Sequence, residues 1–171
     1  MTHYTEISSP WGPLLLTAEG ATLTGLYYPG GRHAPAPADD WRRSPGLPVF
    51  TAVERQLGEY AAGRRREFGV PLALRGTPFQ RAVWDAIRTV PYGDTTTYRA
   101  LAERAGDGRA VRAVGAATGR NPISIIVPCH RVVGAGGALT GYAGGLERKR
   151  ALLALEASCL LHSAGAAAAF L

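Results

Sequence analysis

The chain has 171 residues and a mass of 18.0 kDa; 46% of its residues are hydrophobic and 19% are charged. This composition supports one large or two small packed domains and excludes a disordered or fibrous chain. No apolar run approaches the ~20 residues of a membrane span, and Met1 to Pro10 lacks a basic segment followed by an apolar one. We therefore expect a cytoplasmic protein that does not contact a membrane.

The formal net charge is +6, and all basic residues except Lys149 are arginine. Residues 1–76 carry eight basic and seven acidic groups, whereas residues 77–156 carry eleven and six, a net charge of +5. Arginine forks bind phosphate oxygens well. A codon bias of a G+C-rich genome would also favour arginine over lysine, but it would not concentrate net charge in one half. The second half is therefore a candidate surface for a polyanion.

The two cysteines, Cys129 and Cys159, limit the metal and redox chemistry. The sequence has no C-x-x-C pair, so we expect no metal site and no cofactor. A disulfide between the two is not expected in a chain without an export signal.

The first half is predicted to form a small antiparallel sheet with one helix. Short β-compatible runs are separated by Pro- and Gly-containing turns, and a Pro-rich loop at 29–48 precedes apolar residues at helical spacing. The expected strands are Tyr4–Ser8, Leu14–Glu19, Leu23–Tyr28 and Phe68–Leu74, and the expected helix begins near Phe50 and ends at Gly63. A domain boundary at Arg75-Gly76 gives an N-terminal β-sheet and helix domain, residues 1–76.

The second half, residues 77–171, is predicted to be mainly helical, so the fold class is α+β. Thr77-Pro78 begins a helix that runs to about Thr89. Thr97 caps a short helix ending at Gly106, and another follows at 109–118. Two short helices around a glycine-containing turn indicate a helix-turn-helix, with a winged-helix-like arrangement.

The last of these helices is rich in small residues. Its members Ala110, Ala113, Gly115, Ala116 and Ala117 leave little side-chain bulk. Either this helix packs tightly against the core or its backbone approaches a partner closely. Composition alone favours neither interpretation.

Cys129 is the candidate nucleophile. The apolar run Ile123–Val127 is expected to be a strand that delivers the thiol beside His130 and Arg131, whose positive charges would lower its pKa. The alternative is a buried, inert cysteine. In an extended segment, His130 would point away from its neighbour and act through a bound water.

Such a relay needs a carboxylate to orient the imidazole. The only acids that follow Cys129 are Glu147 and Glu156, on a helix expected from Gly145. Leucines at 146, 152, 153 and 155 would anchor this helix in the core.

The segment Pro128-Cys129-His130-Arg131 closely resembles the O6-alkylguanine-DNA alkyltransferases, also called methylated-DNA-protein-cysteine methyltransferases. About eighty residues match in order and spacing. The matching motifs are Thr77-Pro78-Phe79-Gln80, Val90-Pro91-Tyr92-Gly93, Thr97-Tyr98, Arg112-Ala113-Val114-Gly115, Arg120-Asn121-Pro122, Gly141-Tyr142-Ala143-Gly144-Gly145-Leu146 and Leu152-Leu153-Ala154-Leu155-Glu156.

The resemblance implies stoichiometric, irreversible transfer of an alkyl group from O6 of guanine, or O4 of thymine, to Cys129. His130 would deprotonate the thiol through water, Glu156 would orient His130, and Tyr98 would hydrogen-bond to guanine N3. Arg112 would fill the gap left by the flipped base, and Asn121 would tie its helix to the catalytic segment. The other implied contacts to DNA are Thr97, Ala113, Ala116, Ala117, Arg120 and Arg131, and the implied pocket residues are Ser124, Val132, Tyr142 and Ala143.

The implied partner is double-stranded DNA that contains O6-alkylguanine, bound by a monomer through the minor groove with weak sequence specificity. Three alternatives remain. Alkyltransferase-like sensors bind the lesion but lack the cysteine, a helix-turn-helix regulator would prefer one sequence, and a cysteine hydrolase would turn over esters. The presence of Cys129 argues against a sensor.

Overall fold

The N-terminal part is built on a four-stranded sheet. The computed structural model describes residues 1–169, with side chains to residue 164. Strands β1 (His3–Ile7), β2 (Leu14–Glu19) and β3 (Thr22–Tyr27) form the expected antiparallel meander, each within one residue of its predicted start. A fourth strand, β4 (Arg42–Arg43), pairs in parallel with β1, so the sheet is mixed, in the order β3-β2-β1-β4. This two-residue strand was missed because it lies within a Pro-rich loop.

Helix α1 (Pro48–Ala61) covers this sheet. Its buried side chains include Phe50, Val53, Leu57 and Tyr60, which are the apolar positions expected from the sequence together with their neighbour Val49. The helix therefore closes the core of the N-terminal part.

The predicted strand Phe68–Leu74 is wrong. Only Leu72 pairs, as an isolated parallel bridge to Leu23 of β3. The Leu23 amide donates to Pro71 O, and the Ala73 amide donates to Leu23 O. Pro71 itself has no N–H to continue a ladder, so alternation of apolar residues here reflects packing against the sheet edge rather than strand pairing.

Three helices form the compact unit of the C-terminal part. Helix α2 (Pro78–Arg88) begins with the expected Thr77 cap, extended into a capping box by Gln80. Helices α3 (Tyr98–Arg104) and α4 (Val111–Gly119) pack against α2 and against each other as the predicted helix-turn-helix. The Trp84 indole N–H of α2 donates to Ala117 O of α4 at 2.8 Å, which fixes the two helices together.

The segment that leads to Cys129 is not the predicted strand. Ile123 makes an isolated bridge to Leu26, the chain then turns, and Ile125 has a φ of 70°. Cys129 begins the 3-10 helix η1 (Cys129–Arg131), which leads into β6 (Val132–Val133), parallel to β5 (Thr96–Thr97). The apolar run is continuous because it is buried on all sides, and burial alone does not distinguish a strand from a packed turn.

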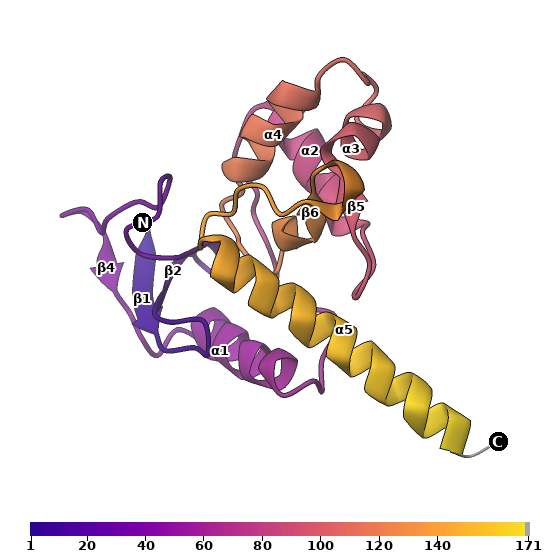
Figure 1. Cartoon of the computed structure of the whole chain (residues 1–171). Coiled ribbons are helices and arrows are strands. Elements are labelled where there is room, and N and C mark those ends of the chain that lie inside the picture. The colour runs from indigo at the N-terminus through magenta and orange to yellow at the C-terminus, as the bar shows by residue number, and fades with distance from the viewer. Residues whose placement is uncertain (170–171) are drawn as a thin grey trace.

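Helix α5 (Leu146–Ala169) follows a second 3-10 turn, η2 (Ala135–Gly137). It passes between α1 and the C-terminal helices and then projects from the molecule towards the C-terminus (Figure 1). Leu152 is fully buried, as expected, but Leu146 is 41% exposed because it lies at the first turn, outside the core. One helix thus contacts both parts of the protein.

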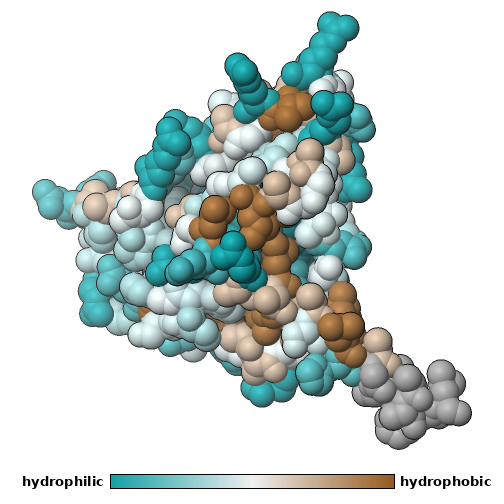
Figure 2. Space-filling model, in the orientation of Figure 1, coloured by the Kyte–Doolittle hydropathy of each residue, from teal (hydrophilic) through white to brown (hydrophobic). Residues whose placement is uncertain are grey.

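Hydrophilic side chains project from several parts of the face in Figure 2, including the N-terminal part. Long hydrophilic side chains project from the end that carries α3 and α4 (Figure 2). Within residues 1–169, no helix has the length and apolarity needed to cross a membrane.

Candidate active site

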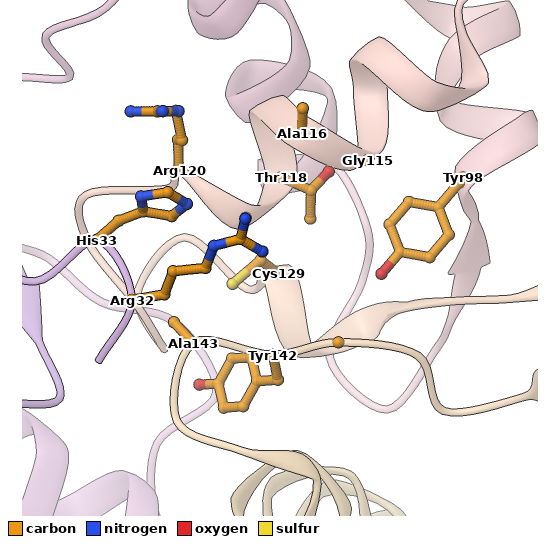
Figure 3. Close-up of a pocket in the computed structure, with 12 residues that line it drawn as sticks. Arg32, His33, Tyr98, Gly115, Ala116, Thr118, Arg120, Cys129, Tyr142 and Ala143 are labelled. Atoms are coloured by element: carbon orange, nitrogen blue, oxygen red, sulfur yellow. The ribbon is translucent and has the colours of Figure 1, made fainter. Parts of the chain in front are cut away.

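Cys129 lies at a cavity of about 430 Å³ between α4, the loop at 141–143 and the loop that follows β3. The side chain is 5% exposed, and its sulfur points into the space shown in Figure 3. The cavity is lined by Arg32, His33, Tyr98, Gly115, Ala116, Thr118, Gly119, Arg120, Cys129, Gly141, Tyr142 and Ala143. A small planar group that enters this cavity would meet the thiol.

His130 and Glu156 form a buried pair beside the thiol. Nε2 of His130 lies 2.9 Å from Oε1 of Glu156, and both side chains are 0% exposed. Glu156 also accepts hydrogen bonds from the Tyr60 hydroxyl at 2.7 Å, the Gly93 amide at 3.1 Å and the Arg131 guanidinium at 2.8–3.2 Å. Of the two acids expected to be able to orient the imidazole, the fold selects Glu156.

The protonation of this pair follows from its contacts. Burial raises the pKa of Glu156, but the hydrogen bond from His130 and the hydrogen bonds and charge of Arg131 outweigh it and hold the pKa at about 2. Burial, together with the charges of Arg131 and Lys149, lowers the pKa of His130 despite the opposing effect of Glu156. An ionised carboxylate only accepts, so Nε2 carries the hydrogen of a neutral ring. Nδ1 then carries a lone pair, and this buried atom has no hydrogen-bond partner among the residues that the structure describes.

The expected activation of the thiol by adjacent charges is wrong. Burial raises the pKa of Cys129, and the opposing effects of the Asn121 amide and the Lys149 charge are smaller. Arg131 does not act on the sulfur because its guanidinium is bound to Glu156 and, at 2.7 Å, to Val90 O. The thiol of the free protein is therefore protonated at neutral pH and requires a base.

Asn121 holds the irregular segment before the cysteine in place. Its amide Nδ2 donates to Val127 O at 2.9 Å, and its Oδ1 accepts from the Ile123 amide at 3.0 Å. These bonds satisfy backbone groups that a turn would otherwise leave unpaired, including those around the strained Ile125. Asn121 thus joins the end of α4 to the cysteine segment, as the resemblance implies.

The opposite wall is the loop that carries Tyr142 and Ala143. The Tyr142 hydroxyl lies 2.8 Å from that of Tyr28, at the end of β3. A Cβ added at Gly144 would come within 2.7–2.9 Å of the Tyr28 ring, so this approach requires glycine. The Tyr98 hydroxyl donates to Thr140 O at 3.1 Å. The loop is therefore held by both the N-terminal part and α3.

The surface of α4 presents only some of the expected DNA contacts. Arg112, Ala113, Ala116 and Arg120 are exposed, and the Thr97 side chain caps α3 by accepting from the Ala100 amide at 3.1 Å. Two further expected contacts are buried in the free protein. Ala117 is 3% exposed, because it faces the core against α2, and Arg131 is 7% exposed, because it binds Glu156.

Two expected pocket residues do not line the main cavity. Ser124 is 1% exposed and lines a much smaller space beside Asn121 and Tyr28. Val132 is fully buried, and its carbonyl accepts a hydrogen bond from Nζ of Lys149. Both cysteines are free thiols, and among the described residues no cluster of three or more His, Cys, Asp or Glu could hold a metal ion.

Two family models match this chain over most of its length. The model described as "6-O-methylguanine DNA methyltransferase, DNA binding domain" matches residues 78–158, and "6-O-methylguanine DNA methyltransferase, ribonuclease-like domain" matches residues 2–74. The chain belongs to the 6-O-methylguanine DNA methyltransferase family. This membership confirms the resemblance and the α+β fold class expected from it.

Individual relatives of this methyltransferase support the same family assignment. The methylated-DNA–protein-cysteine methyltransferase of Mycobacterium tuberculosis is 51% identical over 164 residues, covering 92% of this chain and 94% of the relative. That of Methanosarcina acetivorans is 46% identical over 157 residues, covering 92% and 99%. The crystal structure of M. tuberculosis OGT in complex with DNA superposes with a TM-score of 0.85 at 50% identity, covering 92% and 94% of the two chains. The expected enzyme class is confirmed.

Some residues of the methyltransferase site were missed in the sequence. Arg32 and His33 reach the cavity from a loop after β3 (Figure 3), and Tyr60 of α1 reaches Glu156. Loss of hydration and the positive charges of Arg120 and Arg32 lower the pKa of His33. No local motif marks these positions; only the fold brings them to the C-terminal part.

Proposed function

We propose that this methyltransferase repairs DNA by moving an alkyl group from O6 of guanine, or O4 of thymine, onto its own Cys129, once per molecule. The observation that carries the proposal is the buried Cys129 thiol at the cavity, next to a neutral His130 whose tautomer is fixed by Glu156. A target base enters this cavity with its alkyl group towards the sulfur.

In the transfer, the Cys129 proton passes through a bound water to Nδ1 of His130. The sulfur attacks the alkyl carbon in line, the S–C bond forms, and the C–O6 bond breaks with its electron pair left on guanine. Since burial raises the pKa of the thiol, removal of this proton is the step that needs His130. The imidazolium formed is stabilised by the ionised Glu156.

The departing guanine is an anion until it gains a proton. Tyr98 lies at the cavity, and its hydroxyl donates to Thr140 O in the free protein. We propose that it redirects this hydrogen bond to guanine N3, which stabilises the anion. The thioether left on Cys129 has no low-energy route back to a thiol, so the protein is consumed by one reaction.

The cavity cannot be reached by a base that stays in the helical stack. The target nucleotide is therefore flipped out, at a cost of a few kcal/mol. Arg112 is exposed on α4 and would enter the stack in place of the flipped base. The small exposed residues Ala113 and Ala116 would let α4 lie close in a minor groove.

The rest of the interface would bind the DNA backbone. Arg120 is exposed at the cavity, and Thr97 lies at the start of α3. Contacts of this kind carry little sequence information, so binding is weakly sequence-specific.

We propose that a monomer acts without a cofactor in the cytoplasm and that residues 1–76 and 77–171 form its two domains.

Mass spectrometry after reaction with a duplex that contains O6-methylguanine tests the proposal. The protein should gain a single methyl group on Cys129. The Cys129→Ala variant should gain none, whereas Cys159→Ala, which changes a cysteine outside the cavity, should react like the wild type. Methylation at Cys159, or repeated turnover per molecule, would overturn the assignment.

A further inference from the structure

Lys149 is the single lysine of the chain, and its side chain is fully buried. Its ammonium Nζ donates to three backbone carbonyls: Val132 O at 2.6 Å, Gly141 O at 3.1 Å and Thr140 O at 3.2 Å. These carbonyls belong to β6, directly after the cysteine segment, and to the loop that carries Tyr142 and Ala143. One side chain of α5 thus joins the segment that follows Cys129 to the loop that lines the cavity.

The residue type suits this position. A lysine ammonium has three N–H donors directed away from one nitrogen, whereas an arginine guanidinium has five donors in a flat fork. The three carbonyl oxygens converge on one point, where the ammonium can donate to all of them. A guanidinium is larger and planar, so it could not donate to all three. In a chain that otherwise uses arginine for every basic position, the exception lies where arginine does not fit.

The charge of Lys149 is not balanced by a neighbouring carboxylate. Arg131, the other buried cation, is paired with Glu156, but no ion pair involves Lys149 among the residues that the structure describes. Burial lowers the pKa of Lys149, and interaction with Cys129 raises it; the same interaction acts to lower the pKa of the thiol. The ammonium is held at the Val132 carbonyl, three residues after Cys129.

The Thr140 carbonyl gives this contact a second consequence. It accepts from Lys149 and also from the Tyr98 hydroxyl. If the loop at Thr140 moved, the position of Tyr98 relative to the cavity would change with it. Lys149 is thus connected both to the nucleophile and to the group proposed to stabilise the leaving guanine.

We propose that Lys149 is a positioning residue of the alkyl transfer, which fixes β6 and the 140–143 loop around the cavity and stabilises the Cys129 thiolate by its charge. The inference rests on the proposed role of Cys129 as the alkyl acceptor. The titratable groups nearest the sulfur besides Lys149 are His130 and the Tyr28 and Tyr142 hydroxyls, and Arg32, His33, Tyr98 and Arg120 line the same cavity. Burial raises the pKa of Tyr28 and Tyr142 and keeps His130 neutral. The charge that opposes the effect of burial on the pKa of Cys129 is that of Lys149, not that of Arg32 or Arg120.

The first test compares Lys149→Met with Arg150→Met, which removes a charge from the next, exposed position of α5. Iodoacetamide labelling of Cys129, followed by peptide mass spectrometry across pH, reports thiol ionisation without DNA. Lys149→Met should raise the midpoint by about one pH unit, and hence slow labelling about tenfold at neutral pH, whereas Arg150→Met should match the wild type. An unchanged midpoint in Lys149→Met would refute the electrostatic role.

Lys149→Arg separates charge from shape. It should keep the iodoacetamide midpoint near that of the wild type but slow methyl transfer from O6-methylguanine duplex, because the fork cannot hold all three carbonyls. Full methyl transfer by Lys149→Arg would refute the positioning role. Failure of the proposed function looks different: wild-type Cys129 would then take up iodoacetamide but no methyl group from the duplex.

A measurement on the intact site keeps the inference testable if the variants do not fold. Because the chain has one lysine, protein made with ¹³Cε-lysine yields a single lysine signal. That signal should shift at the same pH at which Cys129 ionises in the labelling experiment, and this shift should be absent in Cys129→Ser. Identical titrations of the two proteins would show that the ammonium and the sulfur are not coupled.

Discussion

Nε2 of His130 and Oε1 of Glu156 lie 2.9 Å apart in a part of the protein that solvent does not reach. The contact joins the 3-10 turn that begins at Cys129 to the C-terminal helix α5. It directs the proton of the imidazole away from the thiol and leaves Nδ1 free to accept one. The chemistry of the site therefore depends on a residue that does not line the cavity.

Replacement of Glu156 by glutamine should slow methyl transfer about 10²-fold, because the amide no longer fixes the tautomer or stabilises the imidazolium. It should also lower the free energy of unfolding by about 3 kcal/mol, since Arg131 loses its buried partner. Single-turnover methylation and urea unfolding measure the two effects. Glu147→Gln, an exposed change on the same helix, is the control and should alter neither. A normal rate in a folded Glu156→Gln protein would contradict the relay.

The stability of the protein should depend on the protonation of His130. Burial holds the pKa of His130 below its ordinary value of 6.5, so below pH 6.5 the unfolded chain binds a proton that the folded protein does not. The free energy of unfolding should therefore have its full value above pH 6.5 and should decline as the pH falls towards about 5.

Urea unfolding of the wild type, His130→Gln and His162→Gln between these pH values checks this dependence. The decline should be shallower in His130→Gln and unchanged in His162→Gln, which replaces an exposed histidine of α5. Equal slopes in all three proteins would show that the histidine is not held neutral by burial.

The two alanines at 116 and 117 should respond oppositely to enlargement. Ala116 is exposed at the cavity, so Ala116→Leu should weaken binding to duplex DNA and leave stability unchanged. Ala117 faces the core beside Trp84, so Ala117→Leu should cost about 1–3 kcal/mol of unfolding free energy. Fluorescence anisotropy with duplex DNA and urea unfolding distinguish the cases. Loss of stability in both variants would mean that no open face of α4 is available to DNA.

Arg112→Ala should reduce reaction with O6-methylguanine in a duplex far more than reaction with the free alkylated base. Only the duplex has a stack to be filled after flipping, and the exposed Arg112 lies outside the cavity. Single-turnover methylation with each substrate, at equal ionic strength, measures the ratio. Equal losses on the two substrates would argue against a role in base flipping.

The elements with local signals were predictable. The Thr77-Pro78 cap, the Gly106 stop and the spacing of Phe50, Val53, Leu57 and Tyr60 each depend on neighbouring residues alone, and the corresponding helices are present. The strand predicted at 68–74 failed because pairing depends on a distant partner, β3, which offers only Leu23 to Leu72.

The properties of the site also divide into those that local sequence signals predict and those that depend on distant residues. Cys129, His130 and Glu156 lie in one short motif and one helix, and their proximity followed from the family resemblance. The sequence did not predict that the pKa of the Cys129 thiol is raised. That shift depends on the burial of the thiol and on the binding of Arg131 to Glu156. Arg32 and Tyr60 are separated from the motif by about seventy residues or more, and nothing in their own neighbourhoods connects them with it.

Lys149 and Glu156 are seven residues apart on α5, which is close to two helical turns. They therefore project from the same side of the helix, one towards the loop carbonyls and the other towards the imidazole. Insertion of a single residue between them would rotate one relative to the other by roughly 100° and would remove it from the site, even with every side chain retained. The length of this stretch of helix is thus as much a requirement for repair as the identity of the residues it carries.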